Sequence, residues 1–121
     1  TCTACPSSAT SPEASTTVSD CSCATGHTGP TILNCTECQA AKYKPTTGGS
    51  ACIDCPANSN SMPGTSFKSS CMCKPGYSGA ATSTQGCQSC DAGKYKPRAG
   101  AKSCTHCSTG TYSPTTSAIG A

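Results

Sequence analysis

The residues of this 121-residue chain that could do chemistry are its 14 cysteines, which occur as seven closely spaced pairs. The pairs run CxxC, CxC, CxxC and then start again: Cys2/Cys5, Cys21/Cys23, Cys35/Cys38, Cys52/Cys55, Cys71/Cys73, Cys87/Cys90 and Cys104/Cys107. Sulfur at these spacings can form disulfides, bind zinc as thiolate, or exchange in a thiol oxidoreductase. These three chemistries make different predictions about the rest of the chain.

Zinc would use repeated CxxC pairs, with His27 and His106 as possible extra ligands. The CxC pairs and the regular loops between them favour disulfides instead. A thiol oxidoreductase would place one CxxC near a βαβ pattern, whereas here seven similar pairs occur and no such pattern surrounds them. We therefore predict disulfides, with no metal site and no cofactor.

Fourteen cysteines permit on the order of 10⁵ complete pairings, so the sequence alone does not settle the connectivity. The cysteines of a CxC are too close to bond without strain, and those of a CxxC bond mainly in redox-active sites. Partners are therefore expected in neighbouring pairs, and a simple ladder gives Cys5–Cys21, Cys23–Cys35, Cys38–Cys52, Cys55–Cys71, Cys73–Cys87 and Cys90–Cys104. The ladder leaves Cys2 and Cys107, which we expect to bond to preceding and following repeats or to another subunit.

The cysteine pattern repeats at an offset of 50 residues that drifts to 52, which indicates a tandem array. The predicted boundaries are repeat 1 over 1–50, repeat 2 over 51–102 and a partial repeat 3 over 103–121. The segment AKYKPTTG at 41–48 aligns with GKYKPRAG at 93–100. Because Thr1 lies directly inside the repeat, we expect a removed signal sequence or a fragment of a longer chain.

The elements that position these cysteines must be small, because large apolar side chains are too few for a conventional core. Nine prolines, twelve glycines and no apolar period of 3.6 residues exclude a long helix. We predict a small disulfide-rich fold of tandem modules in an extended rod, with short β-hairpins whose strands include 42–44 and 94–96. Four tyrosines are expected to pack across disulfides, with a solvated ring in a loop as the alternative: Tyr43, Tyr77, Tyr95 and Tyr112.

The remaining composition excludes several functions. A net charge of +3 without charged blocks predicts no nucleic-acid partner, and no apolar run is long enough for direct membrane insertion. The five acids stand singly and no triad or phosphate loop is present, so no enzyme is predicted. Serine and threonine, 19 of each, favour O-glycosylation, and Asn34 heads the only N-glycosylation sequon. The lysines of the two KYKP segments are expected to be solvated or to meet acids of a neighbouring subunit.

The segment CMCKPGYSG at 71–79, continuing to Cys87, resembles the second half of an epidermal-growth-factor-like module. In that resemblance Cys73–Cys87 is the final bridge and Cys55–Cys71 the one before it. The stretch from Cys87 to Cys107 resembles the cysteine-rich repeats of ephrin-receptor-like and tumour-necrosis-factor-receptor-like ectodomains. No acidic cluster precedes the first cysteine, so no calcium site is implied.

Disulfides on this scale place the chain outside the cytosol, secreted or at the cell surface. We expect a structural repeat unit of a glycosylated filament, surface hair or coat, whose partners are neighbouring repeats or further subunits. Flagellar hairs of protists, the mastigonemes, contain similar cysteine-rich repeats. The alternative is a spacer or ligand-binding ectodomain of a receptor or adhesin.

Overall fold

The computed structural model describes residues 1–120, which fold into very short strands and single 3-10 turns, with no α-helix in this part of the chain. The strands of residues 1–120 have two residues each: β1 Ala9–Thr10, β2 Ser22–Cys23, β3 His27–Thr28, β4 Thr36–Glu37, β5 Lys42–Tyr43, β6 Ile53–Asp54, β7 Ser59–Asn60, β8 Met72–Cys73, β9 Tyr77–Ser78, β10 Gln88–Ser89, β11 Lys94–Tyr95 and β12 Thr105–His106. The 3-10 turns are η1 Val18–Asp20, η2 Ile32–Asn34 and η3 Lys68–Ser70. The structure confirms the small disulfide-rich fold.

The strands form six separate antiparallel pairs: β1 with β2, β3 with β4, β5 with β6, β7 with β8, β9 with β10 and β11 with β12. In β5 and β6, Lys42 lies opposite Asp54 and Tyr43 opposite Ile53. The predicted strands at 42–44 and 94–96 are therefore present, but each ends one residue early. The reason is that the N–H of Lys44 donates to Thr65 O, and that of Lys96 to Ala118 O, outside the strand pair.

One local design recurs throughout the chain. Three residues after the first cysteine of each bridge, and also after Cys107, the backbone takes a positive φ of 61° to 87°, at Ser8, Gly26, Ala41, Asn58, Gly76, Gly93 and Gly110. After each bridge's first cysteine, the first strand begins at the residue that follows this position, and the second strand begins directly after that bridge's second cysteine. A two-stranded ladder is marginal by itself, so each bridge holds together the strand pair beside it.

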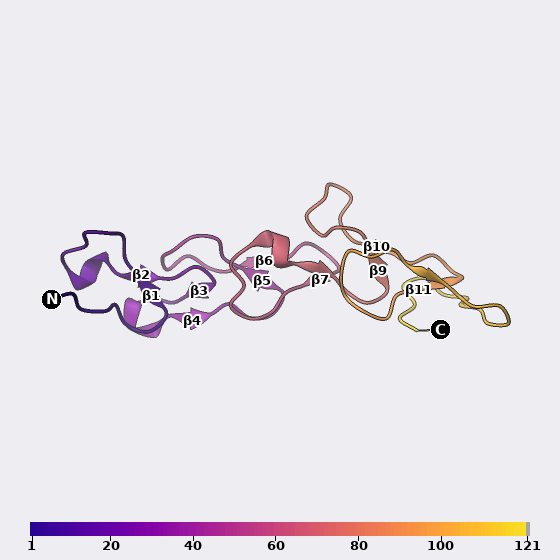
Figure 1. The fold of residues 1–121 in the computed structure, drawn as a ribbon, viewed down its shortest axis with the longest axis horizontal. Helices are drawn as coiled ribbons and strands as arrows, with labels where there is room; N and C mark the ends of the chain where they lie inside the picture. Colours follow the sequence, from indigo (N-terminus) through magenta and orange to yellow (C-terminus); the bar gives the residue numbers. More distant parts are fainter. Residues whose placement is uncertain (121) are drawn as a thin grey trace. The chain divides into compact units, whose positions relative to one another are not determined.

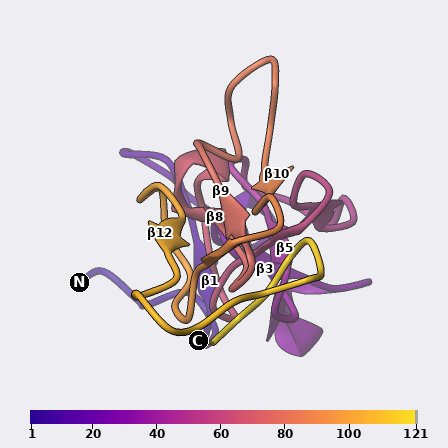
Figure 2. The ribbon, with the colours of Figure 1, turned by 90° about the vertical axis from the view of Figure 1, so that its right-hand side faces the viewer.

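The described chain folds into two compact units. Unit 1 holds residues 1–54 and 61–70, and unit 2 holds residues 55–60 and those from 71 onward. In Figure 1 the strand pairs of unit 1 are found by the labels β1 to β6, and those of unit 2 by β7, β9, β10 and β11. In unit 2 the loop between β9 and β10 stands away from its strand pair in both views (Figure 1, Figure 2).

Sulfur forms the core of both units. Among the described residues the buried apolar side chains are cysteines and Ala81: Cys21, Cys23 and Cys38 in unit 1, and Cys71, Cys73, Cys87 and Cys90 in unit 2. Larger apolar side chains such as Leu33, Met62 and Phe67 are exposed. The bridges thus occupy the interior that apolar packing fills in larger domains.

Candidate functional site

The six disulfides join successive cysteine pairs, and each bridge lies within one compact unit. They are Cys5–Cys21, Cys23–Cys35 and Cys38–Cys52 in unit 1, and Cys55–Cys71, Cys73–Cys87 and Cys90–Cys104 in unit 2, the same pairs that the ladder gives. The bridged Cα atoms lie 5.4 to 5.9 Å apart. Cys2 is free and exposed, and Cys107 is free and half-buried.

In unit 1 the loop 61–65 lies against the module that begins at Cys38. The contact is made by the backbone: Gly64 N–H donates to Cys38 O at 2.8 Å, Ala41 N–H to Ser61 O at 3.1 Å, and Lys44 N–H to Thr65 O at 3.0 Å. The hydroxyl of Ser61 also donates to Lys42 O at 2.9 Å. The loop of one repeat thereby covers the KYKP segment of the module before it.

Unit 2 repeats this contact one repeat later. The loop 113–118 lies against the module that begins at Cys90: Ser117 N–H donates to Cys90 O at 2.9 Å, Gly93 N–H to Ser113 O at 2.8 Å, and Lys96 N–H to Ala118 O at 3.0 Å. The loop sequences differ, SMPGT against SPTTSA, yet the backbone bonds correspond one to one. Because the bonding groups are backbone atoms, the loops can vary in sequence while the contact is kept.

Two glycines allow these loops to approach. A Cβ on Gly26 would lie 2.2 Å from Gly64 O, and one on Gly76 would lie 2.3 Å from Ser117 O. Both glycines also have a positive φ, of 73° and 82°. Any other residue at either position would have to displace the backbone of the loop.

Lys44 and Lys96 are buried, at 1% and 4% exposure, which corrects the expectation that the KYKP lysines are solvated or meet a neighbouring subunit. The ammonium of Lys44 donates to Thr46 O at 2.8 Å and Gly48 O at 2.7 Å. That of Lys96 donates to Tyr77 O at 2.5 Å and to Gly100 O. Burial lowers the pKa of both lysines. Both lysines thus hold the turn that follows them, at Gly48 and Gly100, and Lys96 also bonds strand β9 of the module before it.

The other two lysines of the KYKP segments lie at the surface and face acids of their own module. Lys42 pairs with Asp54 at 2.5 Å across β5 and β6, where Asp54 is 80% exposed. Lys94 lies 3.9 Å from Asp91. Within the described residues both lysines thus have an intrachain partner.

The tyrosines divide into two groups. Tyr43, Tyr77 and Tyr95 lie in paired strands and are half-buried, so their packing across disulfides stays a prediction. Tyr112 is 83% exposed, and the expected packing is wrong for this ring. Tyr112 follows Gly110 where a module's first strand would lie, but no second strand pairs with it among residues 1–120. Without a strand pair and its bridge, nothing covers the ring.

Asn34, the sequon residue, ends the 3-10 turn η2 and is exposed. Its backbone N–H and its side-chain amide both bond Thr31, at 3.0 Å to the carbonyl and 3.3 Å to the hydroxyl. The side chain is therefore at the surface, and its glycosylation stays a prediction.

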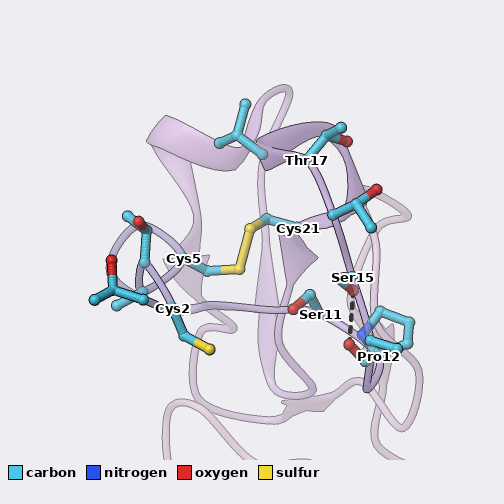
Figure 3. Close-up of a pocket in the computed structure, with 13 residues that line it drawn as sticks. Cys2, Cys5, Ser11, Pro12, Ser15, Thr17 and Cys21 are labelled. Carbon is cyan, nitrogen blue, oxygen red and sulfur yellow. Dashed lines mark hydrogen bonds between the residues drawn. A yellow bond between two sulfur atoms is a disulfide. The ribbon is translucent and has the colours of Figure 1, made fainter.

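A cavity of about 600 Å³ lies beside the free thiol of Cys2. Figure 3 shows the Cys5–Cys21 bridge in the middle of it, with Cys2 on one side and Ser11, Pro12 and Ser15 on the other. Close by, the backbone N–H groups of Thr17 and Thr16 each donate to the Asp20 carboxylate at 2.9 Å and lower its pKa. In the part of the chain that the structure describes, no group of three or more histidines, cysteines or acids could hold a metal ion.

Comparison with known proteins agrees with this geometry. Residues 76–121 match the family model described as tyrosine-protein kinase ephrin type A/B receptor-like. The match covers less than half of the 121-residue chain and spans the modules that begin at Cys90 and Cys107. No curated protein and no solved structure matches the chain. The chain thus carries a cysteine-rich receptor-like repeat, of a kind that places it outside the cell or at its surface.

No helix in residues 1–120 is long and apolar enough to cross a membrane.

Sequence reasoning missed two parts of this site, the contact between loop and module and the burial of Lys44 and Lys96. The signal that could have found the lysines was the identical KYKP in both repeats, each followed by glycine four residues after the second lysine. The loops gave no such signal, because the hydrogen bonds common to both contacts are made by backbone atoms.

Proposed function

We propose that the chain is a structural repeat unit of a secreted, glycosylated filament, surface hair or coat. The observation that carries the proposal is the loop-to-module contact, which recurs with matching backbone bonds at 61–65 and 113–118. A contact made by backbone groups can be repeated along an array whatever the loop sequence, which suits a polymer. Flagellar hairs of protists are the particular filaments whose repeats this chain resembles.

The proposal includes self-association with neighbouring repeats as the main interaction, and it includes no enzymatic activity, no cofactor and no nucleic-acid partner. It also includes carbohydrate on Asn34 and on the serine- and threonine-rich loops. Exposed aromatic or arginine anchors, which dominate ligand-binding surfaces, are few, because the chain has one arginine and no tryptophan.

The second candidate is a spacer or ligand-binding ectodomain of a receptor or adhesin. The match of residues 76–121 to an ephrin-receptor-like model favours it. In that setting the same modules would hold a binding domain away from the membrane, and the chain would remain monomeric.

Electron microscopy of the oxidised native protein tests the choice. A filament unit is expected to form regular fibres, and reduction followed by alkylation should abolish them. A matched control alkylates only Cys2 and Cys107 in the native state, which keeps all six bridges. It shows whether fibres depend on disulfides between chains or on the bridges that stabilise each module. Monodisperse monomers at every concentration, with the six bridges intact, would refute the filament role and favour the ectodomain.

A further inference from the structure

Residues 11–16, here called the first loop, correspond to 61–66 one repeat later. The offset of 50 residues aligns Ala14, with φ 60°, and Gly64, with φ 73°, and the same backbone conformation recurs at Ser117. The strand pairs beside the two loops also correspond, β1 and β2 with β7 and β8. The first loop therefore has the shape that elsewhere in the chain lies against a module.

The first loop has no module against it in the described chain. Within residues 1–120 the carbonyls of Ser11 and Ser15 and the N–H of Ala14 make none of the bonds that their counterparts make. Exposure follows the same difference. Ser61 is 7% exposed and Thr65 and Ser66 are half-buried, whereas Ser15 and Thr16 are exposed.

The free thiol of Cys2 is a second group at this surface whose bonding differs from that of its counterparts. Its counterparts Cys52 and Cys104 bond Cys38 and Cys90, and the carbonyls of those two cysteines accept the N–H groups of Gly64 and Ser117. Cys38 and Cys90 thus each make two contacts: the sulfur forms a disulfide, and the backbone carbonyl accepts a hydrogen bond from a loop. Cys2 and Ala14 line the same cavity of about 600 Å³. A single cysteine placed there could therefore bond the Cys2 sulfur and accept the Ala14 N–H.

We propose that residues 2–16 form a docking surface for one further repeat of the same kind, placed ahead of Cys2 in the same polypeptide. Its cysteine equivalent to Cys38 would bond Cys2, and its KYKP backbone would bond Ser11, Ala14 and Ser15. A separate copy of this chain offers no free equivalent of Cys38, because Cys38 and Cys90 are both bridged and the segments 41–44 and 93–96 already bond the loops 61–65 and 113–118. Its free Cys107 corresponds in the repeat to Cys5 and Cys55.

The covalent step is thiol–disulfide exchange. The incoming cysteine, as its mixed disulfide with glutathione, is attacked by the Cys2 thiolate, so that the new S–S bond forms and glutathione leaves as thiolate and takes up a proton. Overall, two protein thiols and one oxidised glutathione give one protein disulfide and two reduced glutathiones.

The test uses an extended chain in which residues 1–51 are placed directly ahead of Cys2, so that the added Cys38 precedes Cys2 by the 14 residues that separate Cys38 and Cys52. Mapping of non-reduced peptides should find the added Cys38 bonded to Cys2. Hydrogen exchange at the Ala14 amide should slow about tenfold or more relative to the original chain, toward the rate of the Gly64 amide in the same molecule.

Two controls keep the outcome decisive. In the extended chain carrying Cys2→Ser, docking by the backbone alone should leave Ala14 protected while the added Cys38 stays free. The original chain, oxidised with glutathione at high concentration, should leave Ala14 unprotected even if Cys2 forms dimers. An Ala14 amide that exchanges equally fast in both chains, or protection of Ala14 in dimers of the original chain, would overturn the proposal.

A receptor ectodomain built of these modules needs the same surface as a filament does. The exchange experiment therefore stands or falls separately from the fibre imaging.

Discussion

Lys44 and Lys96 place an ammonium group inside modules that otherwise bury little except sulfur. Each ammonium donates to two backbone carbonyls, which offsets part of the cost of removing the charge from water: those of Thr46 and Gly48 for Lys44, and those of Tyr77 in β9 and of Gly100 for Lys96. The four-carbon stem meanwhile fills space that an apolar side chain would fill in a larger core. Each lysine thus fills part of the core with its stem and joins backbone segments through the hydrogen bonds of its ammonium group.

Replacing Lys44 by Met keeps the stem and removes the donor. We expect Lys44→Met to lower the free energy of unfolding by about 1–3 kcal/mol, because the carbonyls of Thr46 and Gly48 lose their partner. The matched control is Lys42→Met, which removes only a surface ion pair with Asp54 and should cost less than about 1 kcal/mol. Guanidinium unfolding with the disulfides intact measures both, and equal losses would contradict the structural role of Lys44.

The lowered pKa of Lys44 and Lys96 predicts a pH dependence with a definite sign. Between the lowered folded pKa and the ordinary value of 10.5, the unfolded chain binds more protons than the folded one. Stability from these groups must therefore rise with pH through that window and be lowest below it.

The measurement is guanidinium unfolding from pH 7 to pH 10, after Cys2 and Cys107 have been alkylated so that no thiolate rearranges the bridges. The double variant Lys44→Met, Lys96→Met should show a flatter rise than the parent chain. A parent chain whose stability falls relative to the double variant as pH increases would show that the lysines do not titrate as burial requires.

At the scale of residues, the sequence predicts the pairing of the cysteines well and the burial of the lysines poorly. The cysteine types and spacings limit each sulfur to near neighbours, and the structure contains the same six pairs. Lysine burial depends on carbonyls of turns whose conformation the sequence does not specify. The positive φ after each first cysteine was also hidden, because Ser8, Ala41 and Asn58 stand where Gly would have signalled it.

At the scale of elements, the repeated unit is a disulfide, the strand pair beside it and the loop that covers the module before it. The strands have two residues, too few to be specified by alternating hydrophobicity, so pattern alone locates only those in the KYKP segments. The loop contact has no pattern at all, since SMPGT and SPTTSA share little beyond small polar residues. The two loops share a positive φ, at Gly64 and Ser117, and each lies against a glycine of an earlier module, Gly26 and Gly76.

The glycine opposite the loop can be tested without changing the loop. We expect Gly26→Ala to destabilise the chain by about 1–3 kcal/mol more than Gly86→Ala does. Both glycines have positive φ, 73° and 64°, so both variants carry the same backbone strain. Only at Gly26 does the new methyl meet a carbonyl, Gly64 O at 2.2 Å, whereas nothing lies within 4 Å of it at Gly86.

Thermal unfolding gives the two stabilities, and hydrogen exchange gives the location. The amides of Gly64 and Lys44, which bond across the contact, should exchange faster in Gly26→Ala and keep their rates in Gly86→Ala. Equal losses in the two variants would mean that the loop tolerates displacement.

At the scale of the whole molecule, the described chain is two compact units, each with three bridges of its own and its own copy of the loop contact. The repeat boundaries at 50 and 102 stay a prediction, and the compact units are a different division, in which residues 61–70 belong with unit 1 and residues 55–60 with unit 2. A 50-residue period in the sequence marks where the pattern recurs. It does not mark where the folded chain divides, because each repeat gives its loop to the module before it.

This organisation predicts that the loss of one bridge acts locally. Removing a bridge with a 14-residue separation, by Cys90→Ala with Cys104→Ala, should cost about 3 kcal/mol in unit 2. Exchange of the Lys96 and Ser117 amides should then accelerate by about two orders of magnitude if opening limits it. Unit 1 keeps its three bridges, so the Lys44 and Gly64 amides should keep their parent rates.

The reciprocal variant is Cys38→Ala with Cys52→Ala, which removes the bridge of the same separation from unit 1. It should accelerate Lys44 and Gly64 and leave Lys96 and Ser117 unchanged, because in a repeat array stability is a sum of unit and neighbour terms. Acceleration of all four amides in both variants would show that the chain unfolds as one cooperative body. A fibre subunit or spacer assembled from such units should then lose its structure all at once on reduction of any bridge, whereas local loss would let damaged repeats persist between intact ones.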